Sequence, residues 1–177
     1  MRLESERVYL RSLMESDAPV ILEGTQDKEI RYMTGTAVNF TLEQIEKHIK
    51  DIMKDPARYD FAICMQNSDE MIGDLTVDID EKNKKAGFRI AMVSIPFTGK
   101  GYGTEAIKLV QRFVFEELAL NRLQLEVFSH NVRGIRSYEK AGFVQEGILR
   151  QSLYYNQSFS DEIIMAILKC DYEKLSL

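Results

Sequence analysis

The chain has 177 residues, enough for one domain with a sizeable core, and 45% of them are hydrophobic and 29% charged, as in ordinary globular proteins. Its formal net charge of −5 argues against nucleic acid or an anionic membrane surface as the main partner. The two cysteines, Cys64 and Cys170, form no C-x-x-C pair, so the sequence predicts neither a zinc site nor a redox motif. We therefore expect a single domain over residues 1–177 that binds no metal.

The first residues do not resemble a signal peptide, because the charged side chains of Arg2, Glu4, Glu6 and Arg7 interrupt any apolar run. No segment reaches the length of a membrane span. From these two observations we expect a cytoplasmic protein.

The first half of the chain mixes strand-like alternation with helix-like spacing of apolar residues. Thr41 and Gln44 form a capping-box pattern, which indicates the start of a helix. The patterns predict strands over residues 8–13, 59–65, 71–80 and 86–93, and helices over residues 17–24, 27–33 and 42–52.

The most informative stretch follows the strand predicted over residues 86–93. Gly99, Gly101 and Gly103 alternate in a short loop, and an amphipathic helical pattern over residues 104–120 comes next. Glycine lets the backbone approach an anion closely, and the free N–H groups of a first helical turn point at that anion. A strand, a glycine loop and a helix start in this order predict a phosphate site.

Other interpretations of the loop fit less well. A mononucleotide P-loop needs Ser or Thr after its lysine, but Gly101 follows Lys100. Residues 101–106 fit the dinucleotide pattern G-x-G-x-x-A, with Glu126 at a suitable distance to hold a ribose. The rest of the chain is too short for the βαβ units of that fold, so NAD binding is a distant alternative. A simple tight turn rarely needs three glycines in five residues.

The second half of the chain continues the alternation of strands and helices. The patterns predict strands over residues 122–128, 143–155 and 160–169, and a short helix over residues 132–141 that ends at Gly142. The complete order predicts an α+β protein of three layers, with a mixed central sheet of about seven strands and helices on both faces.

Two motifs in this arrangement resemble the GNAT superfamily of acyl-CoA N-acyltransferases. Residues 98–103 (Thr-Gly-Lys-Gly-Tyr-Gly) resemble its Q/R-x-x-G-x-G/A motif, with Thr98 in place of Gln or Arg. Residues 131–143 resemble its N-x-x-(A/G/S)-x-x-x-Y-E-K-x-G-F motif. The resemblance covers nearly the whole chain and is strongest to the branch of ribosomal-protein N-terminal and spermidine acetyltransferases.

This resemblance implies acetyl-CoA as cosubstrate and assigns a role to several residues. Backbone N–H groups near Met92 and Val93 are expected to pair with the pantetheine arm, Asn131 to contact that arm or cap the short helix, and Tyr138 to protonate the leaving thiolate. The segment from Ala86 to Gly99 is one residue longer than the usual pattern, which we interpret as a bulge or a longer loop. The pyrophosphate is expected to bind at the glycine loop and the helix start, residues Thr98, Gly99, Lys100, Gly101, Tyr102, Gly103 and Thr104.

The general base is not evident from the sequence. Glu29, Asp74, Asp78 and His130 are candidates, and a water chain would make a dedicated base unnecessary. The expected activity is direct transfer of an acetyl group to a primary amine, such as a protein N-terminus, a polyamine or another small amine. The family resemblance also allows a homodimer. A CoA-binding module without turnover is the main alternative.

Overall fold

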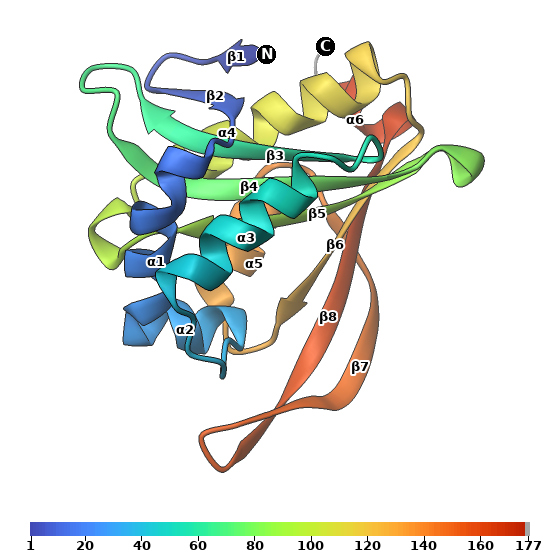
Figure 1. The fold of residues 1–177 in the computed structure, drawn as a ribbon. Helices are drawn as coiled ribbons and strands as arrows, with labels where there is room; N and C mark the ends of the chain where they lie inside the picture. The colour runs from blue at the N-terminus through green and yellow to red at the C-terminus, as the bar shows by residue number, and fades with distance from the viewer. Residues whose placement is uncertain (176–177) are drawn as a thin grey trace.

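The computed structural model describes residues 1–175, which form one eight-stranded sheet with the order β1-β2-β3-β4-β5-β6-β8-β7 (Figure 1). All neighbouring strands are antiparallel except β5 and β6, which are parallel. The strands are β1 (Arg2–Glu4), β2 (Val8–Ser12), β3 (Arg58–Met65), β4 (Met71–Asp80), β5 (Lys85–Met92), β6 (Arg122–Phe128), β7 (Val144–Tyr155) and β8 (Ser158–Leu168).

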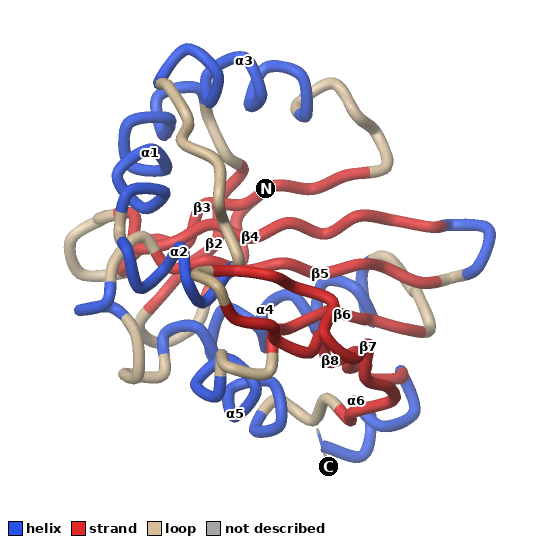
Figure 2. Tube along the Cα trace, turned by 90° about the horizontal axis from the view of Figure 1, so that it is seen from below, coloured by secondary structure: helices blue, strands red, loops and turns tan. Residues whose placement is uncertain are grey.

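Helices cover both faces of this sheet, which confirms the expected α+β class with a mixed sheet. Figure 2 shows α1 and α3 on one side of the strands, and α4, α5 and α6 on the other. The α-helices are α1 (Ala18–Gln26), α2 (Lys28–Thr34), α3 (Leu42–Ile52), α4 (Tyr102–Arg112), α5 (Val132–Lys140) and α6 (Lys169–Leu175). A π-helical segment, Phe113–Glu117, extends α4.

The larger hydrophobic core lies between the sheet and α4. Strand β4 contributes Leu75 and Val77 to it, and α4 contributes Ile107 and Val110, all of which are buried. A smaller apolar cluster packs α1 and α3 against the opposite face, where Ile45 and Ile49 of α3 are buried. Strand β4 contributes to both cores, and β5 is held in the larger one by Ala86 and Phe88, which fixes the strand that leads into the following loop.

The parallel pair β5 and β6 is joined over a short stretch only. The register pairs Lys85 with Arg122, Ala86 with Leu123 and Gly87 with Gln124, and no pairing follows Gly87 among the described residues. Figure 1 shows β6 turning away from β5 beyond this point. The sheet is therefore open between these strands toward the C-terminal end of β5.

The structure adds two elements that the sequence patterns did not predict, β1 and α6. Strand β1 has three residues, too few to show a period, and it makes the eighth strand where about seven were expected. Helix α6 continues directly from β8 at Lys169, so no turn residue separates the two elements. Within residues 1–175, every helix is too short or too polar to cross a membrane.

Candidate active site

The glycine loop connects β5 to α4 through a 3₁₀ turn, Ile95–Phe97. The register of β5 against β4 runs without a shift, so the additional residue lies in a longer loop and not in a bulge. Gly99 and Gly101 have φ values of 72° and 89°, in the left-handed region that favours glycine. Two of the three glycines are therefore required by the backbone path alone.

Helix α4 begins at Tyr102, with Gly101 as its N-cap. The expectation that Thr104 begins or caps this helix is wrong, because Thr104 lies inside the first turn. Among the described residues, no side chain caps this helix. Within residues 1–175, the N–H groups of Tyr102, Gly103 and Thr104 have no acceptor, and Gly103 has open space where a Cβ would lie, with Met92 Sδ at 4.0 Å as its nearest neighbour. Among the described residues, this turn is thus a set of unpaired donors at the positive end of a helix dipole.

Thr98 is held at the entrance of the loop by two hydrogen bonds. Its hydroxyl donates to the Ile95 carbonyl at 2.8 Å and accepts from Arg133 Nη1 at 2.9 Å. Arg133 also pairs with Glu29 of α2. The guanidinium of Arg133 therefore connects the loop, α5 and α2, a connection that the sequence patterns did not suggest.

Met92 and Val93 differ in the availability of their backbone donors. The Val93 N–H donates to the Ile72 carbonyl of β4 at 3.0 Å, so the expectation that it is free is wrong. Antiparallel pairing alternates along the strand, so the Met92 N–H points away from β4, toward the opening between β5 and β6. Of the two expected donors, Met92 keeps its N–H available.

Tyr138 of α5 is buried, with 7% of its surface exposed, and its ring packs edge to face against Phe143 at 5.9 Å between centroids. Burial raises the pKa of its phenol well above the ordinary value. Within residues 1–175, its hydroxyl has no hydrogen-bond partner, yet every fully buried side-chain oxygen and nitrogen has one. The hydroxyl must therefore reach solvent, unlike that of a tyrosine that only packs in a core.

Asn131 caps α5, because its Oδ1 accepts from the Gly134 N–H at 2.9 Å. Its Nδ2 donates to the Met33 carbonyl of α2 at 3.4 Å. The capping role expected for Asn131 is confirmed. A contact with a cofactor arm stays a prediction.

Two of the candidate bases are already engaged by other groups. His130 has Nε2 at 2.6 Å from the Tyr32 carbonyl and Nδ1 at 2.8 Å from Ser160 Oγ, and its ring stacks on Tyr32. Because a carbonyl can only accept, Nε2 carries a hydrogen and Nδ1 is occupied. Glu29 pairs with Arg133. Neither side chain is well placed to take a proton from a substrate.

The other two candidates lie on one face of β4, among charged neighbours. Arg58 of β3 donates to Asp60 at 2.7 and 2.8 Å and lies 3.5 Å from the exposed Asp78. Within residues 1–175, Asp74 has neither a hydrogen bond nor an ion pair, so its carboxylate reaches solvent by the same reasoning as Tyr138. Burial raises the pKa of Asp74 to about 6, and Asp60 adds to this shift, while Arg89 of β5 and Arg58 oppose it.

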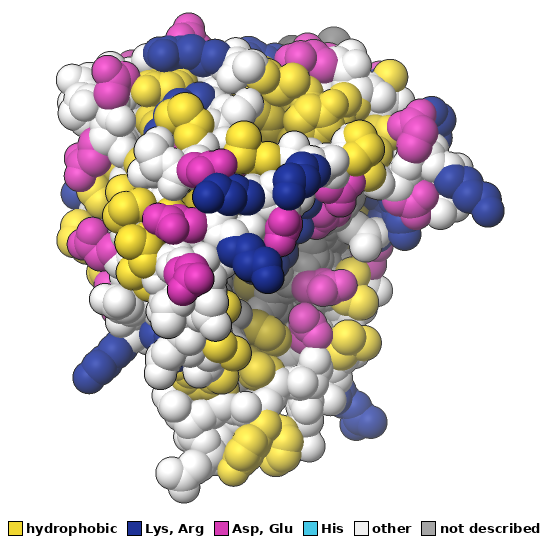
Figure 3. Space-filling model, in the orientation of Figure 1, with side chains coloured by type: hydrophobic (Ala, Val, Ile, Leu, Met, Phe, Trp, Pro, Cys, Tyr) yellow, Lys and Arg dark blue, Asp and Glu magenta, His cyan; other side chains and the backbone are white. Residues whose placement is uncertain are grey.

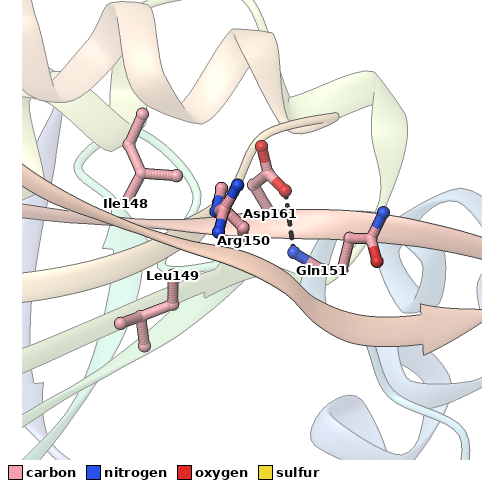
Figure 4. Close-up of a pocket in the computed structure, with 5 residues that line it drawn as sticks. All are labelled: Ile148, Leu149, Arg150, Gln151 and Asp161. Atoms are coloured by element: carbon pink, nitrogen blue, oxygen red, sulfur yellow. Dashed lines mark hydrogen bonds between the residues drawn. The ribbon is translucent and has the colours of Figure 1, made fainter.

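Figure 3 shows the face covered by α1, α2 and α3, where acidic and basic side chains gather around a hollowed area above the β7–β8 hairpin. A pocket on the hairpin is lined by Ile148, Leu149, Arg150, Gln151 and Asp161 (Figure 4). Asp161 accepts the Gln151 N–H at 2.8 Å there, where the β7 register shifts and Gln151 has a φ of 54°. None of the expected site residues lines this pocket, so we do not place the chemistry there.

Comparison with known proteins agrees with this geometry. Residues 7–144 match the model of the acetyltransferase (GNAT) domain. The SPbeta prophage-derived uncharacterized N-acetyltransferase YokL of Bacillus subtilis is 31% identical over 95% of this chain and 93% of its own length. The probable N-acetyltransferase YjcK of the same organism is 29% identical over 97% and 99%.

Among solved structures, spermidine N-acetyltransferase from Vibrio cholerae, in complex with CoA and spermine, has a TM-score of 0.86 and 24% identity. The match covers 94% of this chain and 98% of that one. The chain has the fold of an acyl-CoA-dependent transferase. It belongs to the GNAT family and is an N-acetyltransferase.

Proposed function

We propose that this enzyme acetylates a small primary amine by direct attack of the amine on acetyl-CoA, with the cosubstrate held at the glycine loop and in the opening between β5 and β6. The observation that carries the proposal is the combination of this opening with the free first turn of α4 at its mouth. An anion at that turn meets several backbone donors and the helix dipole at once.

The fit of the loop to a pyrophosphate is supported by its glycines. A side chain at Gly103 would project into open space beside the first-turn donors, where only Met92 Sδ lies within 4 Å. That space is available to phosphate oxygens only while position 103 lacks a side chain. Gly99 has no neighbour within 4 Å of its would-be Cβ, which leaves the outer side of the loop open as well.

The reaction needs a polarised thioester carbonyl, a proton for the departing sulfur and an acceptor for the amine proton. In this proposal the Met92 N–H donates to the thioester carbonyl oxygen. The amine nitrogen forms the new C–N bond as the C–S bond breaks, and Tyr138 gives its proton to the sulfur. Because burial keeps the Tyr138 pKa high, the phenol stays protonated at neutral pH.

We assign to Asp74 the role of attracting the substrate amine and accepting its proton. Its carboxylate is unpaired and lies one residue along β4 from Gly73, which pairs with Met92 across the sheet. An ionised Asp74 attracts an ammonium group and accepts its proton directly or through water. Its pKa of about 6 leaves it ionised at neutral pH and close to the range that suits a general base.

Asp74, which keeps a carboxylate beside Arg58 and Arg89, favours a cationic amine, and the structurally similar spermidine N-acetyltransferase holds spermine. We therefore rank a polyamine or a similar small amine above a protein N-terminus. Polyamines, amino sugars and short peptides should be compared as acceptors in an assay of thiol release from acetyl-CoA. A rate that rises with polyamines and not with peptides supports this ranking, and the opposite pattern contradicts it.

A CoA-binding module without turnover is the alternative. Calorimetry with CoA, acetyl-CoA and NAD separates the binding classes, since only the first two should bind and raise the melting temperature. Amine-dependent turnover then separates an enzyme from a module that binds and does not react.

A further inference from the structure

Arg7 lies in the turn between β1 and β2, far from the glycine loop in sequence but in contact with it in the structure. Its Nη1 donates to the Lys100 carbonyl at 3.0 Å, across 93 positions of the chain. Its guanidinium carbon lies 5.0 Å from the centre of the Tyr102 ring. One side chain thus contacts the residues on both sides of Gly101.

The same guanidinium is anchored to the first turn of α4 through Glu105. Arg7 Nε donates to Glu105 Oε1 at 2.5 Å, and Nη2 contacts the same oxygen. The other carboxylate oxygen accepts from Ser5 Oγ at 2.9 Å and from the Arg7 N–H at 3.2 Å. Because both carboxylate oxygens are used, the position of Arg7 relative to α4 is fixed from several directions.

The contact with Lys100 determines the orientation of a peptide group in the loop. The bond between Lys100 and Gly101 is trans, so its carbonyl and its N–H point in opposite directions. The carbonyl faces Arg7, and the Gly101 N–H therefore faces the other side. Within residues 1–175 that N–H has no acceptor, so it is available to a ligand at the loop.

We propose that Arg7 is a positioning residue for the phosphate groups of acetyl-CoA, because it holds the Lys100–Gly101 peptide so that the Gly101 N–H faces the bound anion. The inference rests on the proposed binding site at the glycine loop. Arg7 acts through the backbone and not as a phosphate ligand, since its donors are directed at Lys100 and Glu105. The close approach is evident at Gly101, where a Cβ would lie 2.9 Å from Arg7 Nη2.

The test compares Arg7→Gln and Arg7→Lys with the wild type. Calorimetry measures CoA binding, and kinetics are measured with two acetyl donors. Acetyl-CoA uses the loop, whereas an acetyl-pantetheine thioester has no phosphates to place there. We expect Arg7→Gln to weaken CoA binding and to raise the KM for acetyl-CoA by about tenfold or more, with kcat little changed. Rates with acetyl-pantetheine should stay at the wild-type level. Lysine keeps the charge but cannot contact Lys100 and Glu105 at the same time as arginine does, so we expect Arg7→Lys to lose less CoA affinity than Arg7→Gln.

Arg122→Gln is the matched control, because Arg122 also forms a two-contact pair with a carboxylate, Glu146, at 2.9 and 2.5 Å. It should leave the affinity for CoA unchanged. The inference would be overturned by unchanged CoA affinity in both Arg7 variants. It would also be overturned by an equal loss of rate with acetyl-CoA and with acetyl-pantetheine. If Arg7→Gln does not fold, the same comparison is made with Arg7→Lys. A wild type that does not bind CoA would instead refute the proposed binding site.

Discussion

The Val93 N–H donates to the Ile72 carbonyl at 3.0 Å, and this bond decides which backbone donors remain at the end of β5. It continues the pairing with β4 one residue beyond Met92 and leaves the Met92 N–H directed at the opening between β5 and β6. A single preorganised donor in that opening is sufficient to polarise a carbonyl, and donors of this kind contribute about 10²–10³ in rate in other enzymes. The hydrogen bond between Val93 and Ile72 therefore leaves the Met92 N–H as the donor to which we assign the thioester carbonyl.

Gly103→Ala and Gly103→Val test whether the pyrophosphate binds against the first turn of α4. The nearest protein atom to the added Cβ is 4.0 Å away, so both variants should fold, and alanine should maintain or raise stability in a helix. The side chain occupies the space proposed for phosphate oxygens, so we expect CoA affinity to fall by about tenfold with alanine and further with valine. Calorimetry measures the affinity and a thermal melt checks the fold.

Gly147→Ala is the control for this series. Gly147 lies on β7, and its added Cβ would meet Ile164 of β8 at 3.8 Å, an ordinary van der Waals contact. This variant should leave CoA affinity at the wild-type value. Equal affinities in the Gly103 variants and the wild type would remove the first turn of α4 from the binding site.

Tyr138→Phe tests the proton donor. The hydroxyl has no partner within residues 1–175, so its removal should change the melting temperature little. We expect kcat to fall by about ten- to a thousandfold, while the affinity for acetyl-CoA changes less. Initial-rate kinetics and calorimetry measure the two effects separately, with Tyr59→Phe, a partly buried tyrosine packed against the larger core, as a control. An unchanged kcat would show that water protonates the sulfur.

The pH dependence follows from the directions of two pKa shifts. If Asp74 accepts the amine proton as proposed, it must be ionised, so kcat/KM should rise with pH through about 6 and then level off. The pKa of Tyr138 is raised, so its proton is retained and it should cause no decline up to about pH 10. Asp74→Asn should remove the acidic limb and lower kcat/KM by about 10²-fold. Asp78→Asn, on the same face but exposed, should preserve the profile.

The same shift predicts an effect of Asp74 on stability. A carboxyl group whose folded-state pKa lies above its ordinary value favours folding only while it is protonated, so stability falls as the pH rises from about 4 to about 6. At pH 7.5 we therefore expect Asp74→Asn to raise the melting temperature by about 2–6 °C. A lower melting temperature would show that the carboxylate is stabilised by a partner and is not held available for the amine.

Direct transfer predicts that neither cysteine carries an acetyl group. Cys64 is buried under α1 and α3, and Cys170 is exposed on α6. We expect Cys170→Ser to retain full activity and Cys64→Ala to retain kcat with reduced thermal stability. Mass spectrometry after incubation with acetyl-CoA alone should find no acetylated cysteine. A stable acetyl adduct on Cys64 or Cys170 that an amine can discharge would contradict direct attack.

Most of the sheet could be predicted from the sequence because its strands are long enough to show a period. Strands β4 and β6 have the predicted bounds, and the capping box at Thr41 begins α3 as expected. The start of α4 was misplaced because Thr is a common N-cap residue, whereas the loop reaches α4 through Gly101 in a left-handed conformation. The residue at which α4 begins depends on the path of the whole loop.

In the candidate site, the sequence indicated most clearly those residues that are close together along the chain. The motifs around Gly101 and Tyr138 are local, so they were evident before the fold was known. The role of Asp74 depends on the register of β3, β4 and β5, and its difference from Asp78 is a matter of burial. The contact of Arg7 with the loop joins residues 93 positions apart. Neither relationship leaves a pattern in one sequence.

The most direct test of the account is the stoichiometry of a single reaction mixture. Wild-type protein with acetyl-CoA should release thiol at a low rate, and a polyamine should raise that rate and yield one acetylated amine for each thiol released. Tyr138→Phe should bind acetyl-CoA under the same conditions and release thiol much more slowly. Saturated binding of acetyl-CoA with no amine-dependent thiol release, across polyamines, amino sugars and peptides, would contradict the assignment of this site to acetyl transfer.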